Sequence, residues 1–305
     1  MTILLRGIII VLLNITIAIL WFMVLHVFTY SDSIGGILRV STTTSLYATG
    51  LLEKLADEFR KYYPNVVIQF IAVGSGRALE LAAKGDIDMV LVHAPQLERE
   101  YINRGILIDG SIIAYNYFVI VGPGDDPAGI RGLSNPVSAF KRIYMAGVMG
   151  KALFISRGDN SGTHVRELSL WRKAKLNPRG QEWYIESGTG MAKTLLIANE
   201  KRAYTLSDVG TFLKLKCEGV LGELEILVSG GVDLINIYSA YIVNPREYNV
   251  NYKLAKLFLE FITSNEGQKI ISLYGKSEFG QPLFYPAKGK EVELRRYWKK
   301  LAEEV

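Results

Sequence analysis

The segment from Phe154 to His164 has the residue types and spacing best suited to bind a ligand. An apolar run at its start is followed by a loop rich in hydroxyl groups and glycines, and then by apolar residues at helical spacing. A strand, a donor-rich loop and a helix start together favour anion binding, because free backbone N–H groups at a helix N-terminus point outward and the helix dipole favours negative charge. Ser161 and Thr163 add hydroxyl donors, and Arg157 adds a permanent cation.

Three further loops have the same character. Ser41–Ser45 is a run of five hydroxyl residues after the first expected strand, and a helix cap accounts for at most one or two of them. Gly74–Gly76 is a Gly-Ser-Gly turn, which by itself is a weak signal. Ser187–Met191 contains two glycines that allow backbone N–H groups to approach a ligand closely. We therefore expect four donor loops around one anion.

These loops offer many donors and few carboxylates. That chemistry fits a fully ionised oxyanion, which only accepts hydrogen bonds. A phosphate that keeps a proton would need an acceptor, and Asp159 could supply one, so phosphate stays open. Our preferred interpretation of Asp159 is that it pairs with Arg157 or caps the helix that follows.

Other kinds of chemistry have little support. Asp159, Ser161 and His164 lie within six positions, but the chain lacks a G-x-S-x-G nucleophile elbow, so we expect no serine hydrolase and no enzyme. With three histidines and one cysteine, we expect no metal centre, no cysteine cluster and no intrachain disulfide. His93, at a strand end, is expected to make a structural hydrogen bond.

The charge and the motifs exclude two further classes. The net charge of +5 is diffuse, and the chain has no basic stripe with interleaved aromatic residues, so a nucleic acid is not an expected partner. The chain has no Walker motif, so it is not the ATPase of a transporter.

Beyond residue 36, strand-like runs alternate with helical ones, which is typical of α/β folds. The expected strands are 37–40, 66–73, 88–92, 112–121, 153–156, 183–186, 203–206, 224–227 and 234–243. The expected helices are 46–63, 78–83, 163–175, 191–201, 207–215, 253–264 and 266–274, followed by a charged, solvated C-terminal helix.

The two long runs near 112–121 and 234–243 enclose the middle of the chain. A chain that crosses to a second lobe and later returns needs two such crossings. We therefore predict an α/β protein with lobe 1 at 37–117 and 236–305, lobe 2 at 118–235, and a ligand cleft at the hinge, beyond the carboxyl ends of the strands.

The N-terminus predicts export. Gly7 to Tyr30 has no charged residue if His26 is neutral, follows Arg6, and exceeds the roughly 20 residues that span a bilayer. We expect residues 1–36 to be a signal-anchor segment and favour an uncleaved anchor, since the apolar run is long for a signal peptide; a secreted protein is the alternative if the segment is cleaved. The cysteine, Cys217, is too far from the N-terminus for a lipoprotein.

From Ile37 to Tyr274 the chain resembles one known family. The motifs that carry the resemblance are STTTS, AVGSG, GDIDMVLVHAP, YNYFVIVGP, SRGDNSGTH, GTGM and AYTLSDVGTF. These resemble the Tup-type tungstate-binding proteins, which are extracytoplasmic substrate-binding components of ABC transporters. The resemblance implies a type II periplasmic-binding-protein fold, whose two lobes close on one oxyanion.

The resemblance also implies a ligand, partners and site residues. The ligand is tungstate, with molybdate as a close alternative, and no cofactor is needed. The partners are a transporter permease with its ATPase and, through the N-terminal helix, the membrane. The implied binding residues are Thr43, Thr44, Ser45, Ser75, Gly76, Arg157, Ser161, Gly162, Thr163, Thr189, Gly190 and Met191.

Two positions depart from the family pattern. Asn160 stands where a second aspartate is frequent, and Val209 stands where an arginine is frequent, which leaves Arg157 as the expected cation of the site. The alternatives to a tungstate receptor are a binding protein of the same fold for molybdate, sulfate or phosphate, an enzyme built on this fold, and a membrane-tethered anion sensor without a transporter.

Overall fold

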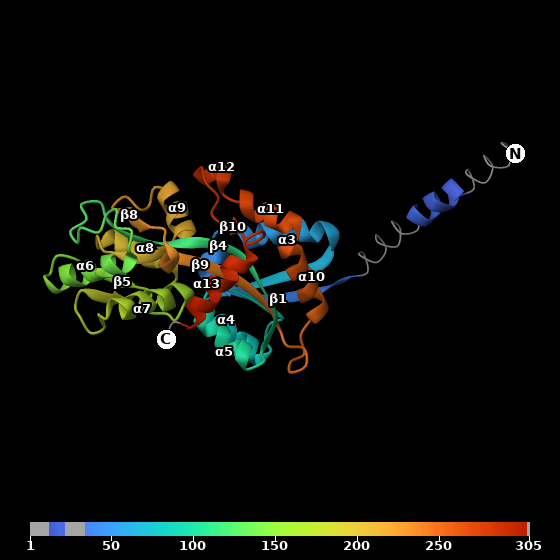
Figure 1. Cartoon of the computed structure of the whole chain (residues 1–305), viewed down its shortest axis with the longest axis horizontal. Coiled ribbons are helices and arrows are strands. Elements are labelled where there is room, and N and C mark those ends of the chain that lie inside the picture. Colours follow the sequence, from blue (N-terminus) through green and yellow to red (C-terminus); the bar gives the residue numbers. More distant parts are fainter. Residues whose placement is uncertain (1–11, 22–33, 304–305) are drawn as a thin grey trace.

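The computed structural model describes residues 12–21 and 34–303. Residues 34–303 form two α/β lobes that lie side by side along the longest axis of the molecule (Figure 1). The predicted α/β, two-lobed architecture is confirmed.

The first lobe is built on three parallel strands that end at one edge. β1 (Gly35–Thr43) is central, with β2 (Asn65–Val73) on one side and β3 (Met89–Val92) on the other. The main path of the sheet is β10-β4-β9-β3-β1-β2, where β10 is Tyr285–Pro286, β4 is Leu107–Pro123 and β9 is Ile235–Val243. β9 is antiparallel to β3 and β4. The helices of this lobe are α2 (Thr44–Ala48), α3 (Leu51–Tyr62), α4 (Ser75–Lys84), α5 (Pro95–Asn103), α10 (Tyr252–Thr263), α11 (Asn265–Leu273) and α12 (Lys276–Phe279).

The second lobe contains the middle of the chain. A parallel pair, β5 (Phe154–Ser156) and β6 (Tyr184–Glu186), supplies two strand ends, and β7 (Thr205–Asp208) and β8 (Leu224–Ser229) pair with β4. Its helices are α6 (Pro136–Val148), α7 (Gly162–Ala174), α8 (Met191–Glu200) and α9 (Val209–Cys217).

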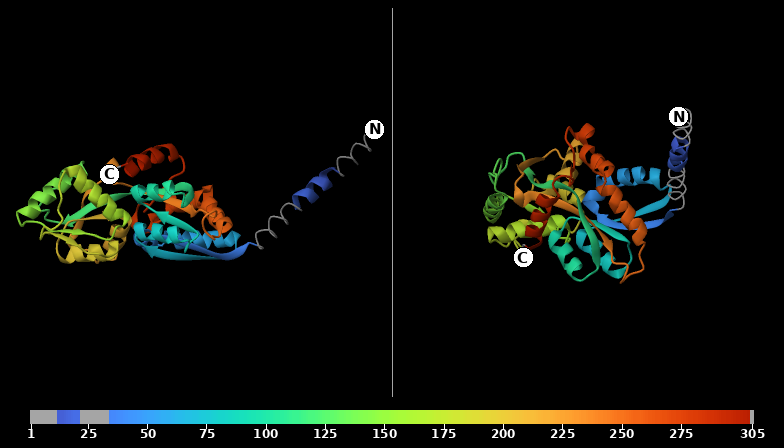
Figure 2. Two further views of the ribbon diagram at one scale, coloured as in Figure 1. Left: turned by 90° about the horizontal axis from the view of Figure 1, so that it is seen from below. Right: turned by 45° about the vertical axis from the view of Figure 1, so that its right-hand side comes forward.

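Two long strands connect the lobes, β4 (Leu107–Pro123) and β9 (Ile235–Val243). In β4, Ile113 and Ala114 belong to a hydrophobic core of the first lobe, whereas Phe118 belongs to a core of the second. The views from different sides show both strands passing through the middle of the molecule (Figures 1 and 2). The hinge therefore lies where one strand changes from one core to the other.

Several expected helices have different bounds. The single helix expected at 46–63 is two helices, α2 and α3, because Gly50 adopts a left-handed φ of 82° between them. α4 begins at Ser75 instead of residue 78. The helices α5 and α6 were not expected at all. Each begins with a proline, Pro95 or Pro136, and the first helical position is the one where proline is well tolerated.

The C-terminal helix α13 (Glu291–Glu303) is not simply solvated, as we expected. Leu294 and Leu301 are buried, and Trp298 Nε1 donates to Oε2 of the buried Glu98 at 2.6 Å. Its charged residues mask an amphipathic pattern. In the view from below, this helix lies across the middle of the molecule (Figure 2).

The predicted N-terminal anchor lies mostly outside the described residues. Of the run at 7–30, the structure describes 12–21, a helix with exposed apolar side chains that include Leu13, Leu20 and Trp21. Among residues 12–21 and 34–303, no helix is both long enough and apolar enough to cross a membrane.

Candidate anion-binding cleft

Strand pairing places the donor loops of each lobe next to one another. In the first lobe, Thr43 is aligned with Val73, so the loops that follow β1 and β2 leave the same sheet edge. In the second lobe, Ser156 is aligned with Glu186, and the N–H of Gly188 donates to the carbonyl of Arg157 at 2.9 Å. Each lobe therefore presents two of the four predicted loops as one surface.

The two surfaces face each other at contact distance. A Cβ atom placed on Gly190 would lie 3.5 Å from Oγ1 of Thr44, which joins the fourth loop to the first. A Cβ atom on Gly76 would lie 2.7 Å from Nδ2 of Asn160, which joins the second loop to the third. The structure thus brings all four predicted loops together, in a closed arrangement of the lobes.

Both surfaces contribute buried donors without a partner. Oγ1 of Thr44 and Oγ of Ser75 come from the first lobe, and Nε of Arg157 and Oγ1 of Thr163 from the second. Among the described residues, none of these four atoms has a hydrogen-bond partner. Burying such a group unpaired costs about 1–3 kcal/mol, so four of them in facing loops indicate a site built for an acceptor-rich ligand.

Arg157 is the cation of this site. Its side chain is 2% exposed, and Nη2 forms an ion pair with Oδ2 of Asp159 at 2.5 Å. The expectation that Asp159 pairs with Arg157 is confirmed. The N-cap of α7 is Ser161, whose Oγ accepts from the N–H of His164, and Oδ1 of Asp159 accepts from the N–H of Ser161 at 3.1 Å.

Two other predicted hydroxyl groups already have local partners. Oγ1 of Thr43 accepts from the N–H of Leu46 at 3.3 Å, as the N-cap of α2. The hydroxyl of Thr189 donates to Oγ of Ser187 at 3.3 Å, within its own turn. Oγ1 of Thr43 also lies 3.4 Å from Oγ of Ser45, where either hydroxyl group can be the donor, and the hydroxyl of Thr189 is engaged within its own turn.

The remaining predicted residues belong to the starts of helices. Gly162 and Met191 are the first residues of α7 and α8, and Gly190 is an N-cap without a side-chain hydrogen bond. Ser45 is buried in the first turn of α2. At these positions the available donor is the main-chain N–H group, which does not depend on the identity of the side chain.

A buried polar chain at the hinge was missed by the sequence analysis. Nδ1–H of His93 donates to Oδ1 of Asn236 at 2.8 Å, and Nδ2 of Asn236 donates to Oδ1 of Asn116 at 2.9 Å. The prediction of a structural hydrogen bond for His93 is confirmed. Burial lowers the pKa of His93 to about 4, and the charge of Arg157 also acts to lower it. The signal for the chain was present, because each asparagine interrupts an apolar strand.

A second carboxylate lies near Arg157. Asp208 is the N-cap of α9 and accepts from the N–H and the hydroxyl of Thr211 at 2.9 and 2.8 Å. Burial raises the pKa of Asp208, and the charge of Arg157 acts in the opposite direction. Its signal was the motif AYTLSDVGTF, which we used for the resemblance but not for the site.

Asp159, Ser161 and His164 are not arranged as a catalytic triad. Nδ1 of His164 accepts from the backbone N–H of Asn160 at 3.0 Å, and Ser161 bonds the backbone of His164 instead of its ring. In the described part of the chain, no group of three or more His, Cys, Asp and Glu is placed to hold a metal ion.

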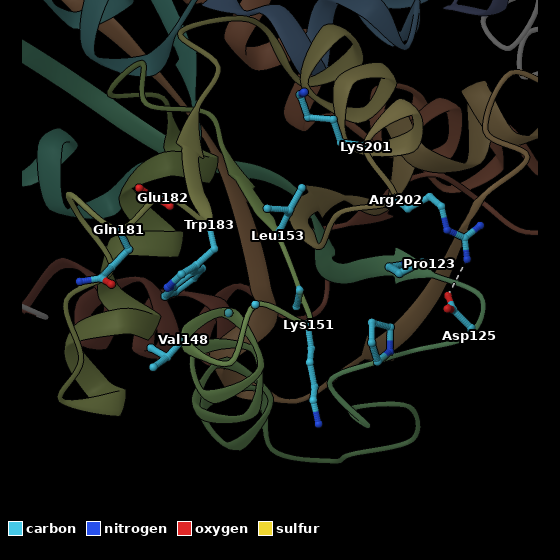
Figure 3. Close-up of a pocket in the computed structure, with 14 residues that line it drawn as sticks. Pro123, Asp125, Val148, Lys151, Leu153, Gln181, Glu182, Trp183, Lys201 and Arg202 are labelled. Atoms are coloured by element: carbon cyan, nitrogen blue, oxygen red, sulfur yellow. Dashed lines mark hydrogen bonds and ion pairs between the residues drawn. The ribbon is translucent and has the colours of Figure 1, made fainter.

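A separate surface depression of about 730 Å³ lies in the second lobe. Trp183, Lys151 and Arg202 line it, and Arg202 is paired with Asp125 at 2.7 Å (Figure 3). None of the predicted binding residues lines this depression, so it is distinct from the cleft.

The fold and the cleft define a class, the two-lobed binding proteins. A family model of the PBP superfamily domain matches residues 30–266. The chain is 40% identical over 258 residues to the tungstate-binding protein TupA of Peptoclostridium acidaminophilum, covering 84% of this chain and 87% of that protein. It is 34% identical to TupA of Campylobacter jejuni, covering 77% of this chain and 86% of that protein.

Solved structures agree with this assignment. The structure described as the tungstate ABC transporter from Geobacter sulfurreducens superposes with a TM-score of 0.69 at 44% identity, covering 78% of this chain and 98% of that chain. TupA from Desulfovibrio alaskensis G20 gives a TM-score of 0.68 at 38% identity, covering 83% of this chain and 99% of that chain. The chain belongs to the TupA family within the PBP superfamily. The relatives in this family are binding proteins of transport systems and not enzymes.

Proposed function

We propose that this protein is the extracytoplasmic receptor of an ABC transporter and captures tungstate between its two lobes. The observation that carries the proposal is that both lobes contribute buried, unpartnered donors to facing loops, among them Oγ1 of Thr44, Oγ of Ser75, Nε of Arg157 and Oγ1 of Thr163. The names of the relatives support tungstate as the ligand.

The donor set accounts for the choice of ligand class. A fully ionised tetrahedral oxyanion accepts hydrogen bonds and has none to give. Hydroxyl, guanidinium and main-chain donors replace its water shell with charge-assisted hydrogen bonds when the lobes close. Oδ2 of Asp159 pairs with Arg157 and its Oδ1 accepts from the N–H of Ser161, so this carboxylate is a poorer acceptor for a protonated oxyanion such as hydrogenphosphate. Molybdate has the same chemistry and nearly the same size, and it is the second candidate ligand.

The proposed binding residues differ in role. Thr44, Ser75, Arg157 and Thr163 donate from side chains. Thr43, Ser45 and Ser161 add hydroxyl groups next to them. Gly76, Gly162, Gly190 and Met191 provide main-chain N–H groups, whereas Thr189 shapes its own turn.

We also propose the arrangement of the full chain. Residues 37–117 and 236–305 form lobe 1 and residues 118–235 form lobe 2, since β4 changes from one core to the other between Ala114 and Phe118. The apolar N-terminal segment tethers the receptor outside the cell membrane, and the exposed apolar side chains of 12–21 are compatible with lipid contact. A permease reads the closed form, and its ATPase drives transport.

Calorimetric titration of the full chain in detergent with tungstate, molybdate, sulfate and phosphate tests the function. The proposal expects one site that binds tungstate at least about a thousandfold more tightly than sulfate or phosphate, which corresponds to about 4 kcal/mol. If sulfate bound as tightly as tungstate, tungstate would not be the specific ligand and the protein would be assigned to another oxyanion. No heat with any of the four would remove the receptor function altogether.

A further inference from the structure

Two glycines at the cleft lie where the opposite lobe leaves no room for a side chain. Gly162 begins α7 in the second lobe, and His93 follows β3 in the first. A Cβ atom on Gly162 would lie 2.6 Å from the carbonyl oxygen of His93 and 2.8 Å from Cε1 and Nδ1 of its ring. Real Cβ atoms do not approach backbone oxygens so closely, so a side chain at 162 is incompatible with this arrangement of the lobes.

Gly76 shows the same feature at a second point of the cleft. It lies in the first turn of α4 in the first lobe, opposite Asn160 of the second. A Cβ atom on Gly76 would lie 2.7 Å from Nδ2 and 3.2 Å from the carbonyl oxygen of Asn160. Asn160 adopts a left-handed φ of 53°.

The backbone conformation does not explain these glycines. Neither Gly76 nor Gly162 has a positive φ, so any residue could adopt their backbone angles. Both occupy early helical positions, where alanine is a better helix former than glycine. The three heavy atoms nearest to each Cβ position belong to the other lobe, so these contacts are lost when the lobes separate.

The histidine is held rigidly against Gly162. Its ring bonds Asn236 at 2.8 Å and stacks on Tyr238 with the ring centroids 5.0 Å apart. Both partners lie on β9, which runs through the hinge. His93 therefore cannot yield to a side chain at 162, whereas the end of the Asn160 side chain at the other contact can move.

We propose that Gly162, and to a lesser extent Gly76, are closure-determining positions: their missing side chains permit the two lobes to reach the closed form, so they set anion affinity through closure in addition to any N–H contact. This inference rests on the proposed function for its effect on affinity. The closure itself is a property of the chain that can be measured without an anion.

A cross-lobe disulfide provides that measurement. A Cβ atom on Gly190 would lie 3.8 Å from Cβ of Thr44, which is about the mean separation in disulfides. In a Cys217→Ser background, the pair Thr44→Cys and Gly190→Cys can be oxidised to a disulfide only when the lobes are closed. The rate of cross-linking under a fixed concentration of a copper–phenanthroline oxidant then reports the closed population.

Adding Gly162→Ala to this pair should slow cross-linking by about tenfold or more, which is the effect expected of overpacking at a rigid contact. Gly222→Ala is the matched control, because a Cβ atom there meets nothing within 4 Å. Cross-linking at the parental rate in the Gly162→Ala protein would overturn the proposal. So would a parental pair that does not cross-link, since the closed approach would then not occur.

If the Gly162→Ala protein does not fold, Gly76→Ala provides the same test of closure. It should slow cross-linking by about threefold or more, and adding Asn160→Gly should restore the rate, since glycine keeps the left-handed backbone and removes the opposing side chain. Failure of that rescue would contradict a contact between these two residues.

The effect on binding separates this inference from the proposed function. If the wild-type chain binds tungstate, Gly162→Ala in the wild-type chain should weaken binding by the same factor by which it slows cross-linking in the cysteine pair, because apparent affinity scales with the competent population. The melting temperature without anion should stay the same or rise. If the wild-type chain binds no tungstate but the cross-linking results hold, the proposed ligand is wrong and the closure-determining role stands.

Discussion

At the scale of single residues, the hydroxyl groups of the cleft should contribute unequally to binding. Oγ1 of Thr163 is buried without a partner among the described residues, whereas the hydroxyl of Thr189 is bonded to Ser187 in its own turn. Thr163→Val, which preserves shape, should weaken tungstate binding by about tenfold or more, since hydrogen bonds to a charged group contribute about 1.5–3 kcal/mol.

Thr189→Val is the matched control and should change affinity by less than about threefold, a shift of well under 1 kcal/mol. Equilibrium titration of both variants at the same ionic strength makes the comparison. Equal losses would mean that the turn of Thr189 opens toward the ligand and that its hydroxyl is a direct donor.

The contribution of the Arg157 charge to binding is best tested by substituting Arg157 and Asp159 together. Removing the guanidinium alone would leave the carboxylate of Asp159 without its ion-pair partner, and breaking such a buried pair costs about 3–5 kcal/mol. Arg157→Gln combined with Asp159→Asn keeps the polar contact and removes both charges. The double variant should fold normally and bind tungstate about a hundredfold more weakly or worse, because a buried charge-assisted contact is lost.

Asp159→Asn alone provides the control for that experiment. It keeps the cation and removes a negative charge close to the anion, so affinity should be retained or raised. Calorimetry gives the affinities, and urea unfolding checks the fold. Wild-type affinity in the double variant would exclude Arg157 from the site.

At the scale of elements, a buried carboxyl group supports the strand that leads into the third loop. Glu167 of α7 accepts from Oγ of Ser156 at 2.8 Å and from the hydroxyl of Tyr184 at 2.7 Å. Burial raises its pKa to about 7. Because the folded pKa exceeds the ordinary value near 4.5, this group favours folding below about pH 4.5, and that contribution is lost as the pH rises to about 7.

Glu167→Gln should therefore flatten the pH dependence of stability. Between pH 5 and 8 the wild type should lose more free energy of unfolding than the variant, by roughly 3 kcal/mol at most. Urea unfolding at both pH values measures this difference, with the exposed Glu182→Gln as control. Identical pH profiles for Glu167→Gln and the wild type would show that Glu167 keeps an ordinary pKa.

The C-terminal helix offers a second test at this scale. Trp298→Phe removes the donor to the buried Glu98 and keeps most of the apolar contact. Leaving that carboxyl group with one partner fewer should cost about 1–3 kcal/mol of stability in urea unfolding at pH 8. A change below about 0.5 kcal/mol, the usual range for surface substitutions, would mean that α13 does not depend on this bond.

The elements show what the sequence could and could not predict. The loops after β1, β2, β5 and β6 were recognisable because donor residues and glycines sit between an apolar run and a helical pattern. The start of α4 was not, since Ser75 and Gly76 look like part of a turn. The burial of α13 was masked because lysines and arginines surround its apolar residues, Leu294 and Leu301.

At the scale of the whole molecule, the sequence predicted two lobes but not which loops meet. Pairing within each lobe follows from parallel strands. Contacts across the cleft, such as Gly162 with His93 and Gly76 with Asn160, depend on the path of β4 and β9 through the hinge. Side-chain packing between lobes determines that path, and no local pattern reports it.

The central claim is that one oxyanion is bound between four loops of two lobes. Crystals grown with sodium tungstate and measured at the tungsten absorption edge test it most directly. The account predicts one dominant anomalous peak within hydrogen-bonding distance of the side chains of Thr44, Ser75, Arg157 and Thr163. A dominant peak in the depression near Lys151 and Arg202, or no peak in the cleft, would contradict it.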